Sequence, residues 1–221
     1  MSDSANNMEP KEALFSASNR KLLTNPLGKD NPINVQVLGI CSVLAITVQL
    51  KPSLVMAISV VAVMGFANVI ISMLRKTIPP RIRIIVQLTV IASLVILVDQ
   101  ILKAFVYDVS RQLSVFVGLI ITNCIIMGRL EAFALKSKVW PSFLDGIGNA
   151  VGYGWVLLTV AFFRELFGSG TLFGYQVIPN VLYELGYVNN GLMILPPMAL
   201  ITVGIIIWVQ RSRDRSLIDV S

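Results

Sequence analysis

The chain contains two apolar segments that are too short for ordinary membrane-spanning helices, and each carries one of its only two cysteines. A helix rises about 1.5 Å per residue and a bilayer core is about 30 Å thick, so a span needs about 20 apolar residues. Residues 113–128 make an apolar run of only 16 and contain Cys124, and residues 33–50 contain Cys41. This pattern predicts a frame of membrane helices that brings Cys41 and Cys124 together inside a bilayer.

The composition is that of a protein with several membrane spans. Of the 221 residues, 55% are hydrophobic and 14% are charged, whereas soluble domains carry about 25% charged residues. Six apolar segments cover residues 33–50, 53–74, 84–102, 113–128, 146–163 and 191–209. We therefore predict an all-α polytopic membrane protein with six transmembrane helices, which occupy a domain of residues 33–209.

The basic residues predict that both termini are cytoplasmic, with an N-terminal tail at 1–32 and a C-terminal tail at 210–221. If the N-terminus is placed inside, 14 of the 18 Lys and Arg residues lie in the tails and connections on the inner side of the membrane. The other four lie near the outer ends of the segments. This bias follows the positive-inside rule. Membrane orientation also explains the net charge of +6. No nucleic-acid partner is therefore expected.

The two halves of the chain have the same order of helices and opposite topology. Residues 33–102 and 113–209 each read as one short segment followed by two longer ones, and the second segment of each half ends near an arginine, Arg75 or Arg164. Because three helices per half is an odd number, the two repeats must be inverted. Short or interrupted segments at matching positions of inverted repeats indicate a site near the membrane midplane.

The depths of the two cysteines agree with such a site. At the helical rise, Cys41 lies about 12 Å from the inner membrane boundary at Ile33, and Cys124 lies about 16 Å from the outer boundary at Leu113. In a core about 30 Å thick, these depths place both thiols within a few ångströms of one plane.

Two thiols at one depth leave several roles open. Cysteine is among the most buried residue types and often serves only in packing, while a disulfide would explain neither short segment. The chain has no histidine, which excludes His-ligated haem, His-containing zinc sites and Ser-His or Cys-His catalysis. A zinc or iron–sulfur site needs four ligands, typically four cysteines, and no Asp or Glu lies beside Cys41 or Cys124 to make up the number. This chain offers two, so a partner chain would have to supply the others.

Two carboxylates lie at predicted ends of spans, Asp99 at the outer end of the third and Asp145 at the inner start of the fifth. Ionisable groups at membrane depth are functional candidates, here for a cation pathway. The alternative is a solvated helix end, and Asp145 could also be a stabilising first-turn carboxylate. Arg164 and Glu165 are expected to form a local ion pair.

Several motifs resemble a known family. Thr-Asn-Cys occurs at 122–124 and Gly-Arg-Leu-Glu-Ala-Phe-Ala at 128–134. Further matching stretches are 36–41, 83–87, 145–149, 164–170 and 172–174. Over residues 31–209 the chain resembles the D-subunit family of the sodium-translocating NADH:quinone oxidoreductases (Nqr), whose homologues occur in Rnf complexes. Residues 98–100 and 152–154 look more like the Nqr version.

The resemblance implies a component of a bacterial inner-membrane NADH:ubiquinone reductase, a translocase in which this chain is not catalytic alone. It implies six helices in two inverted repeats with short or broken first helices. The chain would pair with a homologous, inverted E-type partner beside the A, B, C and F components of the complex.

The resemblance also implies an intramembrane [2Fe–2S] cluster ligated by Cys41, Cys124 and two cysteines of the partner. The cluster would pass electrons across the membrane and couple them to sodium export, while other subunits carry FAD, FMN and riboflavin. The alternatives are a component of an Rnf-type ferredoxin:NAD oxidoreductase, a secondary transporter with inverted repeats, or a passive membrane scaffold.

Overall fold

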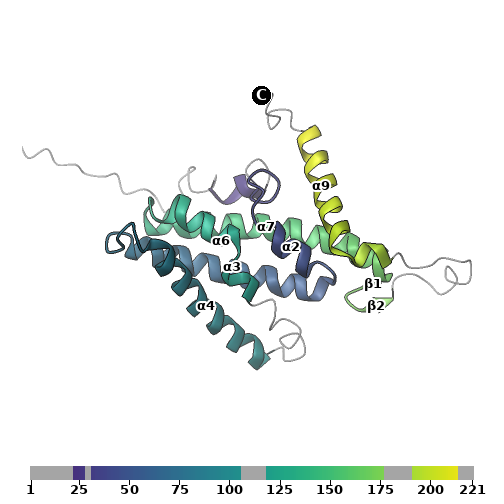
Figure 1. Cartoon of the computed structure of the whole chain (residues 1–221), viewed down its shortest axis with the longest axis horizontal. Coiled ribbons are helices and arrows are strands. Elements are labelled where there is room, and N and C mark those ends of the chain that lie inside the picture. The colour runs from purple at the N-terminus through teal and green to yellow at the C-terminus, as the bar shows by residue number, and fades with distance from the viewer. Residues whose placement is uncertain (1–21, 28–30, 106–117, 177–190, 214–221) are drawn as a thin grey trace, which may run out of the picture.

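A computed structural model describes residues 22–27, 31–105, 118–176 and 191–213 (Figure 1). The described elements are η1 (Asn25–Leu27), α2 (Ile40–Ile46), α3 (Leu50–Leu74), α4 (Arg83–Phe105), α6 (Cys124–Arg129), η2 (Leu130–Ala134), α7 (Val139–Ser169), β1 (Thr171–Leu172), β2 (Tyr175–Gln176), η3 (Gly191–Ile194) and α9 (Pro196–Arg213). The turns η1 and η3 are 3₁₀ helices, η2 is π-helical, and β1 and β2 form an antiparallel hairpin. In these ranges, α3, α4 and α7 are long and apolar enough to cross a membrane.

Some predicted regions fall outside the described residues. These are most of the N-terminal tail, the start of the fourth apolar segment, the loop at 177–190, and the C-terminal tail from residue 214 onward.

The core is built on α3 and α7, which run antiparallel along each other (Figure 1). Gly154 of α7 lies against Ala57 of α3, whereas Gly146 lies against Met64 and Asn68, so the residue numbers rise in opposite directions. A Cβ atom on Gly146 would come within 2.5 Å of the Asn68 amide nitrogen. Small residues thus allow the close helix contact that membrane helices need when burial from water does not drive their association.

The outer surface of this core is apolar, as expected for contact with lipid. Large side chains such as Ile58, Phe66, Trp155 and Trp208 are between 58% and 71% exposed. An exposed apolar surface of this extent indicates contact with a membrane or with other proteins. Together with the three long apolar helices, it identifies the molecule as a membrane protein.

The helix that contains the fifth apolar segment, 146–163, extends beyond that segment at both ends, because α7 covers Val139–Ser169. The helix begins before Pro141, since N–H groups of the first turn have no partner within the helix and a proline there removes no hydrogen bond. Gly170 ends it in the left-handed conformation, with φ 67°. For the same reason α3 begins at Leu50, ahead of Pro52, and not at residue 53.

The described parts of the two short apolar segments contain only short pieces of helix. In the first, Val37 and Gly39 have φ of 57° and 81°, and the seven-residue helix α2 follows. In the second, residues 118–121 are helical, the helix breaks at Thr122 and Asn123, and α6 begins at the next residue. Over the described residues, each uninterrupted piece of helix in these segments is therefore much shorter than a full span.

Part of the predicted N-terminal tail packs on the core. A Cβ atom on Gly148 of α7 would lie 2.6 Å from the carbonyl oxygen of Leu22. One on Gly152 would overlap the carbonyl oxygen of Pro26, and the Asn31 amide donates to the Gly152 carbonyl at 3.1 Å. The glycines of α7 therefore serve two faces, one against α3 and one against the backbone of residues 22–27 and the Asn31 side chain.

Candidate cysteine site

Cys41 and Cys124 come together at the starts of two short helices. Cys41 is the second residue of α2 and Cys124 is the first residue of α6. Both thiols are free and exposed, and they lie close to each other. The chain thus presents two neighbouring, accessible thiols. Within the described ranges, no cluster of three or more His, Cys, Asp or Glu residues could complete a metal site.

The backbone around the pair favours negative charge. The first N–H groups of a helix lack partners within the helix and form the positive end of its dipole. Both cysteines occupy that first turn, and the Asn123 side chain caps α6 by accepting from the Ile125 N–H at 3.2 Å. Anionic sulfur ligands inside a membrane need such compensation.

Three polar side chains lie beside the thiols. The Tyr153 hydroxyl of α7 lies 2.7 Å from the Ser42 hydroxyl oxygen, and Ser42 donates to the Gly39 carbonyl at 2.8 Å. The Asn123 amide donates to the Ser42 oxygen at 3.4 Å. Neither Ser42 nor Tyr153 was predicted from the sequence. The only signal for them was their place beside Cys41 and within the Gly-Tyr-Gly stretch at 152–154.

Arg164 of α7 lies at the other end of α2 and is only 1% exposed. It donates to the Leu44 carbonyl at 3.4 Å and the Thr47 hydroxyl at 2.6 Å, both at the end of α2. It also donates to the Met193 and Ile194 carbonyls of η3, at 3.1 and 2.6 Å. One buried guanidinium group thus joins α7, α2 and η3.

The predicted ion pair between Arg164 and Glu165 was wrong. The Glu165 carboxylate instead accepts from the backbone N–H of Leu50, at 2.6 Å, where α3 begins. Arg164 and Glu165 therefore both hold the α2–α3 junction. The Arg164 cation binds a carbonyl group at the end of α2, and the Glu165 carboxylate binds an N–H group at the start of α3. Both contacts match the helix dipoles.

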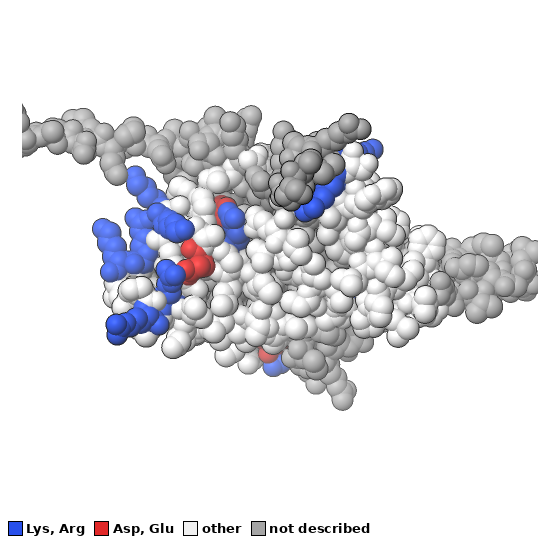
Figure 2. Space-filling model, turned by 45° about the horizontal axis from the view of Figure 1, so that its top comes forward, with Lys and Arg blue, Asp and Glu red and all other residues white. Residues whose placement is uncertain are grey.

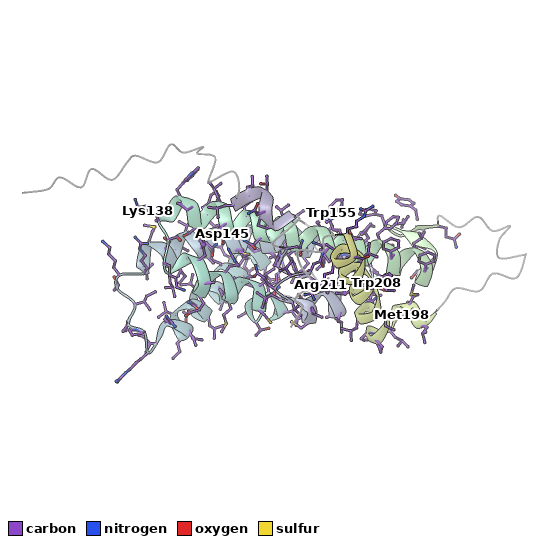
Figure 3. All side chains as sticks on the ribbon, turned by 90° about the horizontal axis from the view of Figure 1, so that it is seen from above. Lys138, Asp145, Trp155, Met198, Trp208 and Arg211 are labelled. Atoms are coloured by element: carbon purple, nitrogen blue, oxygen red, sulfur yellow. The ribbon has the colours of Figure 1, made fainter. Side chains whose placement is uncertain are left out.

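The two candidate carboxylates are each paired with a cation. Asp145 lies between Lys138 and Trp155 along α7 (Figure 3) and forms a two-pronged ion pair with Arg129, whose Nε is 3.0 Å from Asp145 Oδ2. Asp99 lies 2.6 Å from Lys103 on α4. Because α7 begins at Val139, Asp145 lies beyond the first turn, so the interpretation as a first-turn carboxylate was wrong. A role for either residue in a cation pathway stays a prediction.

The helical core and the cysteine site both lie within the part of the chain that matches a known family. The model of a family described as "Rnf-Nqr subunit, membrane protein" matches residues 19–207. The chain belongs to the Rnf-Nqr family. The match includes both cysteines and every described helix of the core except the last turns of α9.

The relatives of this Rnf-Nqr chain are named alike. A protein from Aeromonas hydrophila is 58% identical over 200 residues, covering 90% of this chain and 95% of the relative. One from Photobacterium profundum is 58% identical over 192 residues, covering 87% and 91%. One from Shewanella oneidensis is 55% identical over 193 residues, covering 87% and 92%. Each is named as the D component of the Na(+)-translocating NADH-quinone reductase, a multi-subunit oxidoreductase.

Replacing Asp145 with asparagine is expected to destabilise the Rnf-Nqr chain. The Arg129 side chain is only 17% exposed, and breaking a buried ion pair costs about 3 kcal/mol because one charge is left without a partner. Thermal unfolding in detergent measures the loss. Asp99→Asn is the matched control, since Lys103 is 46% exposed and remains solvated.

The same two variants separate a structural role from a cation pathway. If Asp145 only pairs with Arg129, the sodium dependence of turnover in the assembled complex stays that of the parent. A changed sodium dependence in Asp145→Asn, with Asp99→Asn unchanged, would instead favour Asp145 as a group on the pathway.

Proposed function

We propose that this chain is the D component of a Na⁺-translocating NADH:ubiquinone reductase and holds half of the ligands of an intramembrane [2Fe–2S] cluster. The observation that carries the proposal is the pair of free, exposed thiols of Cys41 and Cys124, which lie close to each other. Relatives at 55–58% identity bear the name of this component over most of the chain. The chain has no catalytic site of its own in this proposal and acts within the translocase.

The residues present suit such a cluster. Iron–sulfur clusters of this type are bound by four cysteine thiolates, and the two thiols here open toward the outside of the chain, where a partner can supply two more. When bound, the cluster would carry single electrons across the membrane. Cys41 and Cys124 would provide its sulfur ligands, and the starts of α2 and α6 would balance the negative charge.

The missing ligands are proposed to come from a homologous E-type partner of inverted orientation, beside the A, B, C and F components. The flavin cofactors, FAD, FMN and riboflavin, would reside on those other chains. In this arrangement electron transfer through the D–E pair is coupled to sodium export, and Asp99 and Asp145 are candidates for the cation pathway.

The six-span inverted repeat has support from reciprocal contacts of two arginines. Arg75, directly after α3, donates to the Ser137 carbonyl at 2.6 Å, just past the end of η2. Arg164 of α7 binds the end of α2 in the same way. Each long helix thus contacts the end of the short helix in the opposite half, as a two-fold relation between the halves requires.

Both termini are proposed to face the cytoplasm of a bacterial inner membrane. In support, Lys and Arg side chains gather at one end of the molecule (Figure 2), where the α3–α4 and η2–α7 connections contribute exposed Lys76, Arg81, Lys136 and Lys138. The Asn34 amide also hydrogen-bonds to Gln210 of α9, which brings the beginning of the first half beside the end of the second.

Reporter fusions test this orientation. Fusions after Lys76 and Lys138 should read as cytoplasmic, and fusions after Lys51 should read as periplasmic, because the positive-inside rule places the basic connections in the cytoplasm. A periplasmic reading after Ser221 would contradict a topology with six spans.

The cluster is tested by analysing iron and acid-labile sulfide in the complex purified from membranes. The proposal expects about two irons and two sulfides for each D–E pair beyond those of any other centre, as a [2Fe–2S] cluster contains. A D–E pair without iron in an intact, active complex would contradict it and would favour the inverted-repeat transporter.

A further inference from the structure

We propose that Tyr153 is a positioning residue whose hydroxyl group sets the separation of Cys41 and Cys124. The inference rests on the proposed function, because it concerns the geometry of the two sulfur ligands. Tyr153 belongs to neither of the helices that carry the cysteines. It projects from α7 to the junction where α2 and α6 begin.

The hydrogen bonds around Ser42 fix the direction of each proton. A serine hydroxyl has one hydrogen to donate and two lone pairs that accept. Ser42 donates to the Gly39 carbonyl at 2.8 Å, so its oxygen must accept from the Tyr153 hydroxyl, at 2.7 Å, and from the Asn123 amide, at 3.4 Å. The Ser42 hydroxyl group therefore makes all three of its possible hydrogen bonds. Of the two that it accepts, the bond from Tyr153 is the shorter.

Each residue bound in this way is a direct neighbour of a cysteine. Ser42 follows Cys41 in α2, and Asn123 precedes Cys124 as the cap of α6. A shift of Ser42 against Asn123 would therefore move the two thiols relative to each other. The direct bond between the two side chains is long, at 3.4 Å, which makes it a weak constraint by itself.

Tyr153 is a suitable fixed point for this arrangement. Its side chain is fully buried, and it extends from a helix of 31 residues packed along α3. The ring also closes on Gly39, where a Cβ atom would lie 3.1 Å from the ring carbon Cε2. The ring contacts Gly39, the residue before α2, and the hydroxyl group binds Ser42 within α2, so both contacts hold the start of α2 against α7.

The test compares Tyr153→Phe with Tyr175→Phe in the full chain, in membranes from cells that lack the partner chains. Phenylarsine oxide, a probe that binds two thiols at once, reports the separation of Cys41 and Cys124. Its affinity is measured by protection of the thiols from a maleimide that reacts with one thiol at a time. Tyr175 is 79% exposed and lies outside the hydrogen-bonded group, so it is the matched control.

Tyr153→Phe is expected to lower the affinity for phenylarsine oxide by about 3- to 10-fold, the equivalent of one hydrogen bond. Maleimide labelling without the arsenical should keep the parental rate, because exposure of the thiols does not change. Ser42→Ala should lose at least as much affinity, because it removes the bond to Tyr153 together with those to Gly39 and Asn123. The double variant should lose no more than Ser42→Ala, since the bond to Tyr153 is already absent there. If Tyr153→Phe does not accumulate, Ser42→Ala makes the same comparison.

Parental affinity in Tyr153→Phe and Ser42→Ala would overturn the proposal, as would an equal loss in Tyr175→Phe. In the assembled complex, Tyr153→Phe should retain iron but change the spin-resonance spectrum or the potential of the cluster. The two hypotheses fail separately. Retention of the cluster in Cys41→Ser contradicts the proposed function, whereas loss of the cluster there with parental arsenical affinity in Tyr153→Phe contradicts only the positioning role.

Discussion

Replacing Cys41 or Cys124 with serine is expected to abolish the optical and spin-resonance signals of the cluster in the assembled complex. Serine has nearly the same size as cysteine, so packing at the starts of α2 and α6 should survive. The cluster would retain three thiolates and one open iron position, and cluster binding is coupled to the fold around it. The effect should therefore fall on the cluster and not on the helices.

The same substitutions should stop electron flow from NADH to quinone. Oxidation of NADH by a soluble acceptor at the cytoplasmic flavin should persist, because that step precedes the cluster. The losses in the two single variants should not add in the double variant, since one site is lost in either case.

Recovery of the complex must be measured alongside, because the proposed cluster would join two chains and its loss would lower assembly. The cluster signals and the turnover rates are therefore expressed per amount of purified complex. An assembled double variant with normal quinone reduction would show that Cys41 and Cys124 only pack in the core.

Replacing Arg164 with methionine is expected to destabilise the chain by about 3–5 kcal/mol, the loss typical of a disrupted buried polar network. Methionine matches much of the length but leaves the carbonyl groups of Leu44 and Ile194 without the guanidinium that they bind. A buried acceptor without a partner costs about 1–3 kcal/mol. Arg164→Lys should recover only part of the loss, because an ammonium group cannot reach several carbonyl groups as the planar guanidinium does.

Thermal unfolding of the full chain in detergent measures these effects, and Arg75→Met is the matched control. Arg75 binds the Ser137 carbonyl from a more exposed position, so its loss should cost only about 1 kcal/mol. Unfolding of Arg164→Met at the temperature of the parent would contradict the role of Arg164 in holding α2 against η3.

The sequence was sufficient for features that depend on local composition. Apolar length and charge placement predicted the membrane class, and the three long helices α3, α4 and α7 lie where apolar runs were expected. Counting residues at the helical rise predicted that Cys41 and Cys124 lie at similar depths in the membrane. That depth stays a prediction, because residues 37–39 and 122–123 interrupt the helices over which the rise was counted.

Other features depended on which helix faces meet, and a single sequence does not encode those contacts in a readable pattern. Neighbouring residues of a helix point in different directions, so Arg164 and Glu165 bind separate partners instead of each other. The close-packing glycines of α7 gave no sign that Gly148 and Gly152 would receive the backbone of residues 22–27 and Asn31.

The group formed by Tyr153, Ser42 and Asn123 shows the same division most clearly. The sequence marked Cys41 and Cys124 by their rarity and by the short segments around them. It did not mark Tyr153, which is distant in the chain and reaches the site only because α7 packs beside α2 and α6. The lengths of apolar segments and the positions of charged residues are properties of the sequence itself, so they can be predicted from it. A hydrogen bond between two helices depends on the distance and direction between its partners, and these are fixed only when the helices pack.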